Sequence, residues 1–344
     1  MADADPEFPP APAPIAERQF ADAADFDQAL RSTREPFVVR GLVADWPLVQ
    51  AGLQSADEAR DYLVARRRDV PFTVAMGETG GGERLFYDDA MGMNFRTGRG
   101  RLDDILRQMA ARENDPDCPA VYLASIDTGQ FFDGLEEEHP IPLGDRDLVR
   151  SIWIGTRTRV AAHNDFPDNL ACVAVGQRRF TLFPPDQFPN LYLGPVDNTP
   201  AGRAISMVDF HTPDLVRFPR FREALRHAQT ADLSPGDALF IPSMWWHHVE
   251  GLAPFNVLMN YWWRDTPRWL GQPQDALNHA LLSIRDLPAE EKRIWRQLFD
   301  HYVFANDAAV TDHIPAEARS VLAPLTPESA GRIRNFLLMQ LGRP

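Results

Sequence analysis

Two stretches, 160–185 and 235–252, combine histidines with apolar runs and constrain this chain more than any other feature. The first carries a His-x-Asp pair, His163 and Asp165, and continues directly into a long apolar segment. The second begins with a Pro-Gly-Asp turn, continues as a short apolar run and reaches His247 beside two tryptophans. Apolar runs bounded by such turns are typical of buried strands. We predict that the two stretches form neighbouring strands of a β-barrel.

The spacing of these polar side chains predicts a metal site. Residues i and i+2 of a strand point to the same face, so His163 and Asp165 aim together. With His247 from the neighbouring strand, they supply two histidines and a carboxylate on one side of an ion, as in non-haem Fe(II) oxygenases. A lone His-x-Asp pair is common on surfaces, and His247 and His248 taken alone fit half-buried core histidines. The combination of both stretches favours the metal site.

Composition excludes several classes of protein. A chain of 344 residues with 44% hydrophobic residues can bury a sizeable core. Its formal net charge of −14 argues against general binding to nucleic acid or to anionic membranes. No apolar run reaches the roughly 18 residues of a membrane span, and the acidic start at Asp3 and Asp5 predicts no signal peptide. With only two cysteines, Cys118 and Cys172, we expect a reducing, cytoplasmic location.

The patterns along the chain predict three regions. Residues 1–15 are rich in proline and alanine, which predicts a disordered tail. Residues 16–265 contain many short strands with Gly and Pro turns, which predicts a mainly β domain with flanking N-terminal elements. Its expected architecture is a double-stranded β-helix of the cupin or jelly-roll type. Within it, 170–175 and 180–183 are predicted to form a hairpin around a Gly-Gln turn.

The third region, 266–344, is predicted to be helical. Apolar residues recur at helical spacing in 274–286 and 289–305, and Thr326-Pro327 has the N-cap and first-turn residues of a further helix. The apolar faces of helices outside a barrel must be buried against another surface. These faces could cover the barrel or a second subunit, and periodicity does not distinguish the two.

Several segments of the chain match the motifs of one known family. They are His163-x-Asp165, Asp168-Asn169-Leu170, Gly176-Gln177-Arg178-Arg179-Phe180, Leu182-Phe183-Pro184-Pro185-Asp186-Gln187-Phe188, Phe218-Pro219-x-Phe221, Pro235-Gly236-Asp237, Ile241-Pro242, Trp245-Trp246-His247-His248 and Asn260-x-Trp262. Through them the chain resembles the cupin-like JmjC hydroxylases, a family of Fe(II)- and 2-oxoglutarate-dependent enzymes that includes asparaginyl hydroxylases. The resemblance extends over roughly 36–264 and implies that His247, and not His248, is the third metal ligand.

The resemblance also implies a set of co-substrate contacts. Arg178 would pair with the distal carboxylate of 2-oxoglutarate, at a position where an asparaginyl hydroxylase of the family has Lys. Arg can bind a carboxylate bidentately, so a positively charged side chain would still pair with the distal carboxylate. Val160 stands where that hydroxylase has Thr, so one hydrogen bond to the co-substrate is lost or supplied elsewhere. Asn169 and Asn260 match positions that flank the co-substrate, and Tyr122 is expected to add a hydroxyl contact.

The function implied is that of a dioxygenase that uses Fe(II), 2-oxoglutarate and O2 to hydroxylate a C–H bond, with succinate and CO2 as co-products. His163, Asp165 and His247 would be its catalytic ligands, and Trp246 would help to exclude water. A protein or peptide side chain is the expected substrate, bound along 186–232 and an acidic loop at 127–148. The family and the apolar C-terminal helices are consistent with a homodimer. The alternatives are a non-oxidative cupin holding Zn or Mn through the same residues and a non-catalytic binding module.

Overall fold

The computed structural model describes residues 11–78, 82–115 and 117–342. The chain divides into two compact units, Met1–Arg264 and Asp265–Pro344. The first unit contains both β-sheets, and the second is helical. No helix of the described residues is long and apolar enough to cross a membrane.

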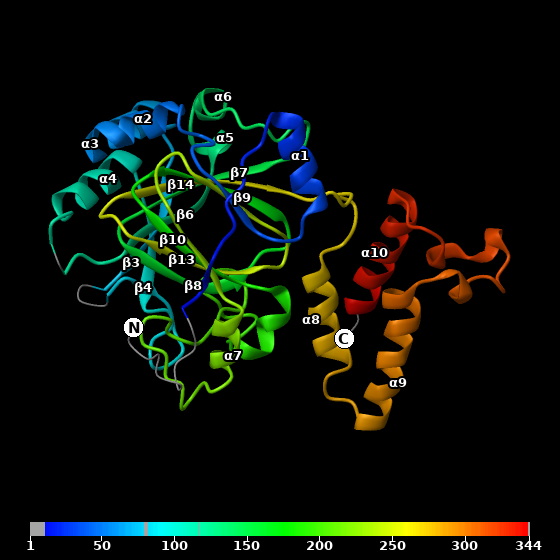
Figure 1. Ribbon diagram of the computed structural model, residues 1–344. Coiled ribbons are helices and arrows are strands. Elements are labelled where there is room, and N and C mark those ends of the chain that lie inside the picture. The colour runs from blue at the N-terminus through cyan, green and yellow to red at the C-terminus, as the bar shows by residue number, and fades with distance from the viewer. Residues whose placement is uncertain (1–10, 79–81, 116, 343–344) are drawn as a thin grey trace, which may run out of the picture. The chain divides into compact units, whose positions relative to one another are not determined.

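The first unit is built on two sheets, as expected for a cupin or jelly-roll fold (Figure 1). Most strands pair antiparallel, while β1 with β11 and β4 with β8 pair parallel. The six-stranded sheet has the order β1 (Ala13–Pro14), β11 (Gln229–Leu233), β10 (Arg178–Phe183), β13 (Trp246–Gly251), β8 (Thr158–Asn164) and β4 (Arg84–Leu85). The eight-stranded sheet has the order β2 (Phe37–Val39), β12 (Ala238–Ile241), β9 (Asp168–Val175), β14 (Asn256–Trp263), β7 (Val149–Gly155), β6 (Val121–Asp127), β3 (Phe72–Gly77) and β5 (Phe95–Gly100).

Strands β12, β9 and β14 of the eight-stranded sheet are buried on both faces, which explains why they are apolar at nearly every position. In β9, Ala171 and Val173 join an inner cluster shared with Phe180 and Val249 of the other sheet. Cys172, on the opposite face, joins a second cluster with the helices, where it is the small buried hydrophobe we expected. The helices of the first half are α1 (Ala23–Ser32), α2 (Pro47–Gln54), α3 (Ala56–Arg66) and α4 (Leu102–Ala111).

The predicted hairpin at 170–183 is wrong. Strand β9 pairs with β12 and β14, whereas β10 pairs with β11 and β13, so the chain passes from one sheet to the other at this turn. Gly176 has a φ of +75°, and a Cβ there would lie 2.5 Å from Phe255 O and from Asn256 Oδ1. The glycine correctly marks a turn. It does not decide which strands pair, because pairing depends on segments far away in sequence.

The predicted disordered tail also needs correction. The Ala13 N–H donates to Ala228 O at 3.0 Å and the Ile15 N–H donates to Thr230 O at 2.9 Å, which adds β1 to an edge of the six-stranded sheet. Pro14 has no backbone N–H to donate. It is tolerated because a strand at the edge of a sheet pairs with a neighbour on one side only. Ile15 is buried in the inner cluster. The part of the expected tail at 1–10 lies outside the described residues.

The excursion after β10 is ordered around its own apolar cluster. Phe183, Leu191, Val208 and Phe221 pack there with Trp246 of β13. The excursion contains η1 (Pro185–Asn190), α7 (Phe221–Arg226) and strand β11, and the sequence patterns predicted neither α7 nor β11. The acidic segment at 127–148 contains two short helices, α5 (Thr128–Phe131) and α6 (Leu135–Glu138).

The second unit follows the predicted helical periodicity. Thr326 caps α10 through a capping box with Ser329, as its sequence indicated. Many large apolar side chains of α9 and α10 are nevertheless exposed, including Trp295, Phe336 and Leu338. The elements of this unit are α8 (Pro273–Ser283), α9 (Ala289–Phe299), the π-helical η2 (Asp300–Ala305), η3 (Ala308–Val310), η4 (Ala316–Ala318), η5 (Ser320–Leu322) and α10 (Pro327–Leu341).

Candidate active site

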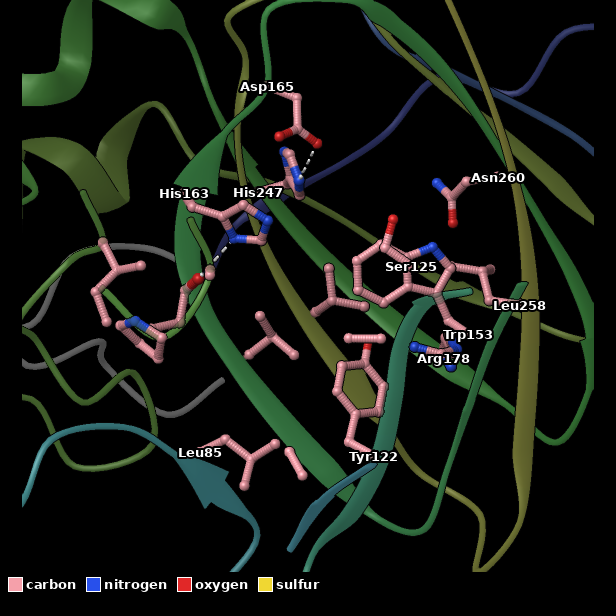
Figure 2. A pocket seen from close by; sticks show the side chains of 18 of the residues that line it. Leu85, Tyr122, Ser125, Trp153, His163, Asp165, Arg178, His247, Leu258 and Asn260 are labelled. Carbon is pink, nitrogen blue, oxygen red and sulfur yellow. Dashed lines mark hydrogen bonds and ion pairs between the residues drawn. The ribbon is translucent and has the colours of Figure 1, made fainter. Parts of the chain in front are cut away.

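Three potential metal ligands meet at the end of strands β8 and β13 (Figure 2). His163 lies in β8, Asp165 follows the end of that strand, and His247 is the register partner of His163 in β13. One ligand atom from each residue lies within 4.8 Å of the other two, and His247 Nε2 is 3.7 Å from Asp165 Oδ2. No other group of three or more such residues occurs in the described parts of the chain.

Backbone hydrogen bonds orient both imidazoles. The Nδ1 atom of His163 is 2.9 Å from Ala161 O, and the Nδ1 atom of His247 is 3.1 Å from Trp245 O. A carbonyl oxygen only accepts, so each Nδ1 carries the proton and each Nε2 keeps its lone pair for a metal. Burial, aided by the charge of His163, lowers the pKa of His247 to about 4 although Asp165 opposes the shift. His247 is therefore neutral at neutral pH, the form that binds a metal.

Strand alternation turns the two neighbouring side chains of His247 away from this group. His248 packs 4.7 Å from the Phe210 ring and lies 3.8 Å from Glu250, and burial lowers its pKa to about 3. Trp246 packs in the excursion cluster and does not line the cavity, so its expected role as a water-excluding wall is wrong. Adjacent residues of a strand face opposite sides, and His247 takes the inner side.

The candidate ligands open onto a cavity of about 410 Å³ between the sheets. Its walls are largely aromatic and aliphatic, and Asp165 is the only carboxylate among the lining residues. The lining includes every predicted co-substrate contact. The residues are Ala75, Leu85, Phe95, Tyr122, Ala124, Ser125, Trp153, Val160, Ala161, His163, Asp165, Asn169, Arg178, Phe180, Pro200, Ala201, Ile205, His247, Val249, Leu258, Asn260 and Trp262.

Arg178 is a buried cation without a carboxylate partner in the described structure. Its side chain is among the largest that are fully buried, and its Nε and Nη2 atoms have no hydrogen-bond partner. Burial raises the pKa of Tyr122, and the nearby Arg178 guanidinium opposes this shift. An unpaired buried charge is costly. The guanidinium therefore presents two free donors to an anionic ligand in this cavity.

Asn169 and Asn260 form a hydrogen-bonded amide pair on the floor of the cavity. Asn260 Nδ2 donates to Asn169 Oδ1 at 2.7 Å, which leaves Asn260 Oδ1 buried without a partner. Val160 also lines the cavity, so residue 160 supplies no hydrogen bond there.

Sequence reasoning missed three polar residues of the cavity: Ser125, Trp153 and Trp262. The indole N–H groups of Trp153 and Trp262 are buried without partners. Ser125 has a φ of +50° at a register irregularity in β6. Strand alternation in 149–155 and 256–263 would have placed both tryptophans on the cavity face, whereas nothing local signals the irregularity at Ser125.

The donor set of the cavity fits a metal ion together with an anion rich in acceptors. The unpartnered polar atoms around it are mainly N–H donors, on Arg178, Trp153 and Trp262, against a single acceptor on Asn260. Two neutral imidazoles and a carboxylate suit a first-row divalent metal. A small carboxylic acid would satisfy the free donors.

Comparison with known proteins identifies relatives of this arrangement. The family model described as "Cupin-like domain" matches residues 23–268. HSPB1-associated protein 1 of Homo sapiens is 37% identical over 134 residues, which cover 38% of this chain and 27% of that protein. Lysine-specific demethylase JMJ31 of Arabidopsis thaliana is 25% identical over 269 residues, or 71% of this chain and 48% of that protein. tRNA wybutosine-synthesizing protein 5 of Gallus gallus is 30% identical over 143 residues, or 37% and 42%. The matched part thus amounts to less than half of each of these relatives.

Proposed function

The chain belongs to the family of cupin-like domains, and we propose that it is an Fe(II)- and 2-oxoglutarate-dependent dioxygenase that hydroxylates a C–H bond. JmjC-type members of this family generally use that metal and that co-substrate. One observation carries the proposal: the candidate ligands and the unpartnered guanidinium of Arg178 line the same cavity. The triad alone would also suit a Zn or Mn cupin. The buried cation beside it favours a metal that works with an organic acid.

Each residue has a distinct task in this proposal. His163 Nε2, His247 Nε2 and the Asp165 carboxylate hold the metal, with the protonated Nδ1 atoms fixed by backbone carbonyls. Arg178, with the Tyr122 hydroxyl beside it, binds the distal carboxylate of the acid. When bound, Fe(II) and 2-oxoglutarate supply the oxidising chemistry that inserts one oxygen atom of O2 into a C–H bond, with succinate and CO2 as co-products. The apolar walls limit the access of water to that chemistry.

We propose a protein or peptide side chain as the substrate. One relative is named as a lysine-specific demethylase, and the net charge of −14 favours a protein over an RNA partner. Pro200, Ala201 and Ile205 of the excursion line the cavity, which supports a substrate path along 186–232. The acidic segment at 127–148 contributes none of the lining residues.

We also propose that the second unit mediates a homodimer. Trp295, Phe336 and Leu338 are 44%, 56% and 64% exposed on α9 and α10. Exposed apolar surface of this extent on amphipathic helices is typical of a protein interface. A second copy of the same helices would bury these side chains in a self-complementary contact.

Turnover of the acid tests the proposed reaction. The full chain is reconstituted anaerobically with Fe(II), its affinity for 2-oxoglutarate is measured by calorimetry, and succinate is then followed under air without a prime substrate. We expect binding together with slow succinate release that requires Fe(II). Intact metal binding with neither acid binding nor succinate would overturn the proposal. That result would favour a non-oxidative cupin or a binding module.

A further inference from the structure

Trp153 has a polar atom that neither the metal ligands nor Arg178 accounts for. Its side chain lines the cavity, and its indole N–H is buried without a partner in the described structure. Burial of an N–H group without an acceptor costs free energy. A bound molecule that offers an oxygen at this point would recover that cost.

The position of Trp153 along the cavity indicates what would supply the oxygen. Figure 2 shows Trp153 between Asn260 and Arg178, across the cavity from His163 and His247. Its ring lies 5.7 Å from that of Tyr122, and both residues line the same cavity as Arg178. In this view the Trp153 side chain therefore forms part of the cavity wall between Asn260 and Arg178.

Among the neighbouring side chains, Trp262 carries a second unpartnered indole N–H, with its ring 6.0 Å from that of Trp153. Val160 and Ser125 offer less competition for this role. Val160 packs against the same cluster as Trp153, around Tyr122, and has no hydrogen-bonding group. The Ser125 hydroxyl already lies 3.4 Å from Ser151 Oγ, within hydrogen-bond distance. Gly155 brings Tyr122 close to β7, because a Cβ there would lie 2.8 Å from Tyr122 Cδ2. This close approach keeps the two aromatic rings together beside Arg178.

We infer that Trp153 is a positioning residue for the co-substrate, whose indole N–H donates to an oxygen of the 2-oxo acid held between the metal and Arg178. The inference rests on the proposed function. It extends that function by adding a neutral donor in the wall of the cavity that holds the metal ligands and Arg178. Such a donor selects an acid of the right length. The acid must reach both the metal and Arg178 for the Trp153 N–H to donate to its oxygen. Loss of one hydrogen bond to a charged acceptor weakens binding roughly 10- to 100-fold.

The test is Trp153→Phe, which keeps an aromatic ring and removes the N–H. Calorimetry with 2-oxoglutarate and its inert analogue N-oxalylglycine, on the full chain loaded with Mn(II), should show affinity for both acids reduced roughly 10- to 100-fold, with unchanged Mn(II) affinity. Adding Val160→Thr to this variant places a hydroxyl on the same part of the wall and should restore much of the loss. The matched control is Trp46→Phe, whose N–H donates to Pro140 O at 2.9 Å away from the cavity. It should bind both acids like the native protein.

The outcomes separate this inference from the proposed function. Native protein that binds neither acid overturns the proposed function. Native protein that binds both, with Trp153→Phe within twofold of it or no weaker than Trp46→Phe, overturns the role of Trp153 alone. A second measurement follows the Trp153 indole N–H signal, which is assigned as the one of the eight indole signals that is missing from Trp153→Phe. In ¹⁵N-tryptophan-labelled native protein loaded with Zn(II), this signal should move downfield on adding the acid. An unshifted Trp153 signal in protein that binds the acid would also overturn the inference.

Discussion

His163 and His247 are register partners on antiparallel strands, and their ring centroids lie 4.3 Å apart. The register places both rings on the inner face of the six-stranded sheet, where Asp165 joins them from the end of β8. Because backbone hydrogen bonds hold the two strands together, the candidate ligands are positioned before a metal arrives. Preorganisation of this kind is what a catalytic metal site requires.

Removal of a candidate ligand should abolish metal binding while leaving the fold intact. We expect His163→Ala and Asp165→Ala each to weaken Fe(II) binding at least roughly 100-fold, because three ligands hold the ion and no other group of this kind is present among the described residues. Anaerobic calorimetry measures the affinity, and far-ultraviolet circular dichroism checks the fold. Asn164→Ala is the control, since residue 164 faces the other side of the strand. Unfolding of both ligand variants would count against the assignment.

Arg178 should be required for acid binding, and it should lower the free energy of unfolding of the protein when no acid is bound. Arg178→Ala is expected to weaken 2-oxoglutarate binding far more than metal binding, and equal acid affinity would remove Arg178 from the site. Arg178→Met replaces an unpaired buried charge with an apolar chain of similar length, so it should raise the free energy of unfolding of the acid-free protein by about 1–3 kcal/mol. Urea denaturation with and without the acid checks this. A less stable Arg178→Met protein would show that the guanidinium has a partner already.

Burial of His248 should make the metal-free protein sensitive to acid. Burial lowers the pKa of His248 to about 3, whereas an unfolded histidine titrates near 6.5. Between these values only the unfolded state binds the proton, so stability falls as the pH drops from about 6.5 towards 3, by up to about 1.4 kcal/mol per pH unit. His248→Gln should therefore lose less stability than the native protein between pH 7 and pH 5 in urea denaturation. Equal losses in the two proteins would contradict the prediction.

The apolar helices of the second unit should associate. Sedimentation velocity of the native chain should show a dimer over micromolar concentrations. Leu338→Glu should shift it towards monomer, because a carboxylate cannot be buried in an apolar contact without a partner. Glu317→Lys, an exposed change outside α9 and α10, should leave the dimer unchanged. A native chain that is monomeric at every concentration would rule out the proposed interface.

Local patterns predicted much of the site. The i, i+2 spacing of His163 and Asp165 and the position of His247 predicted their proximity. Arg178 and Asn260, which the family resemblance implied as co-substrate contacts, do line the cavity. Trp153 went unrecognised because a tryptophan between two apolar residues looks like core. That its N–H has no partner becomes visible only once its surroundings are known.

The sequence by itself determined where most strands, helices and turns lie and which side chains share a face, with α7 and β11 among the exceptions. It could do so because alternation, helical spacing and glycine turns act over a few residues. Only the tertiary structure decided that β9 and β10 belong to different sheets and that the chain at 13–14 adds a strand. These outcomes depend on which distant segments bury each face and satisfy each edge. That choice is a balance of packing and hydrogen bonding over the whole domain.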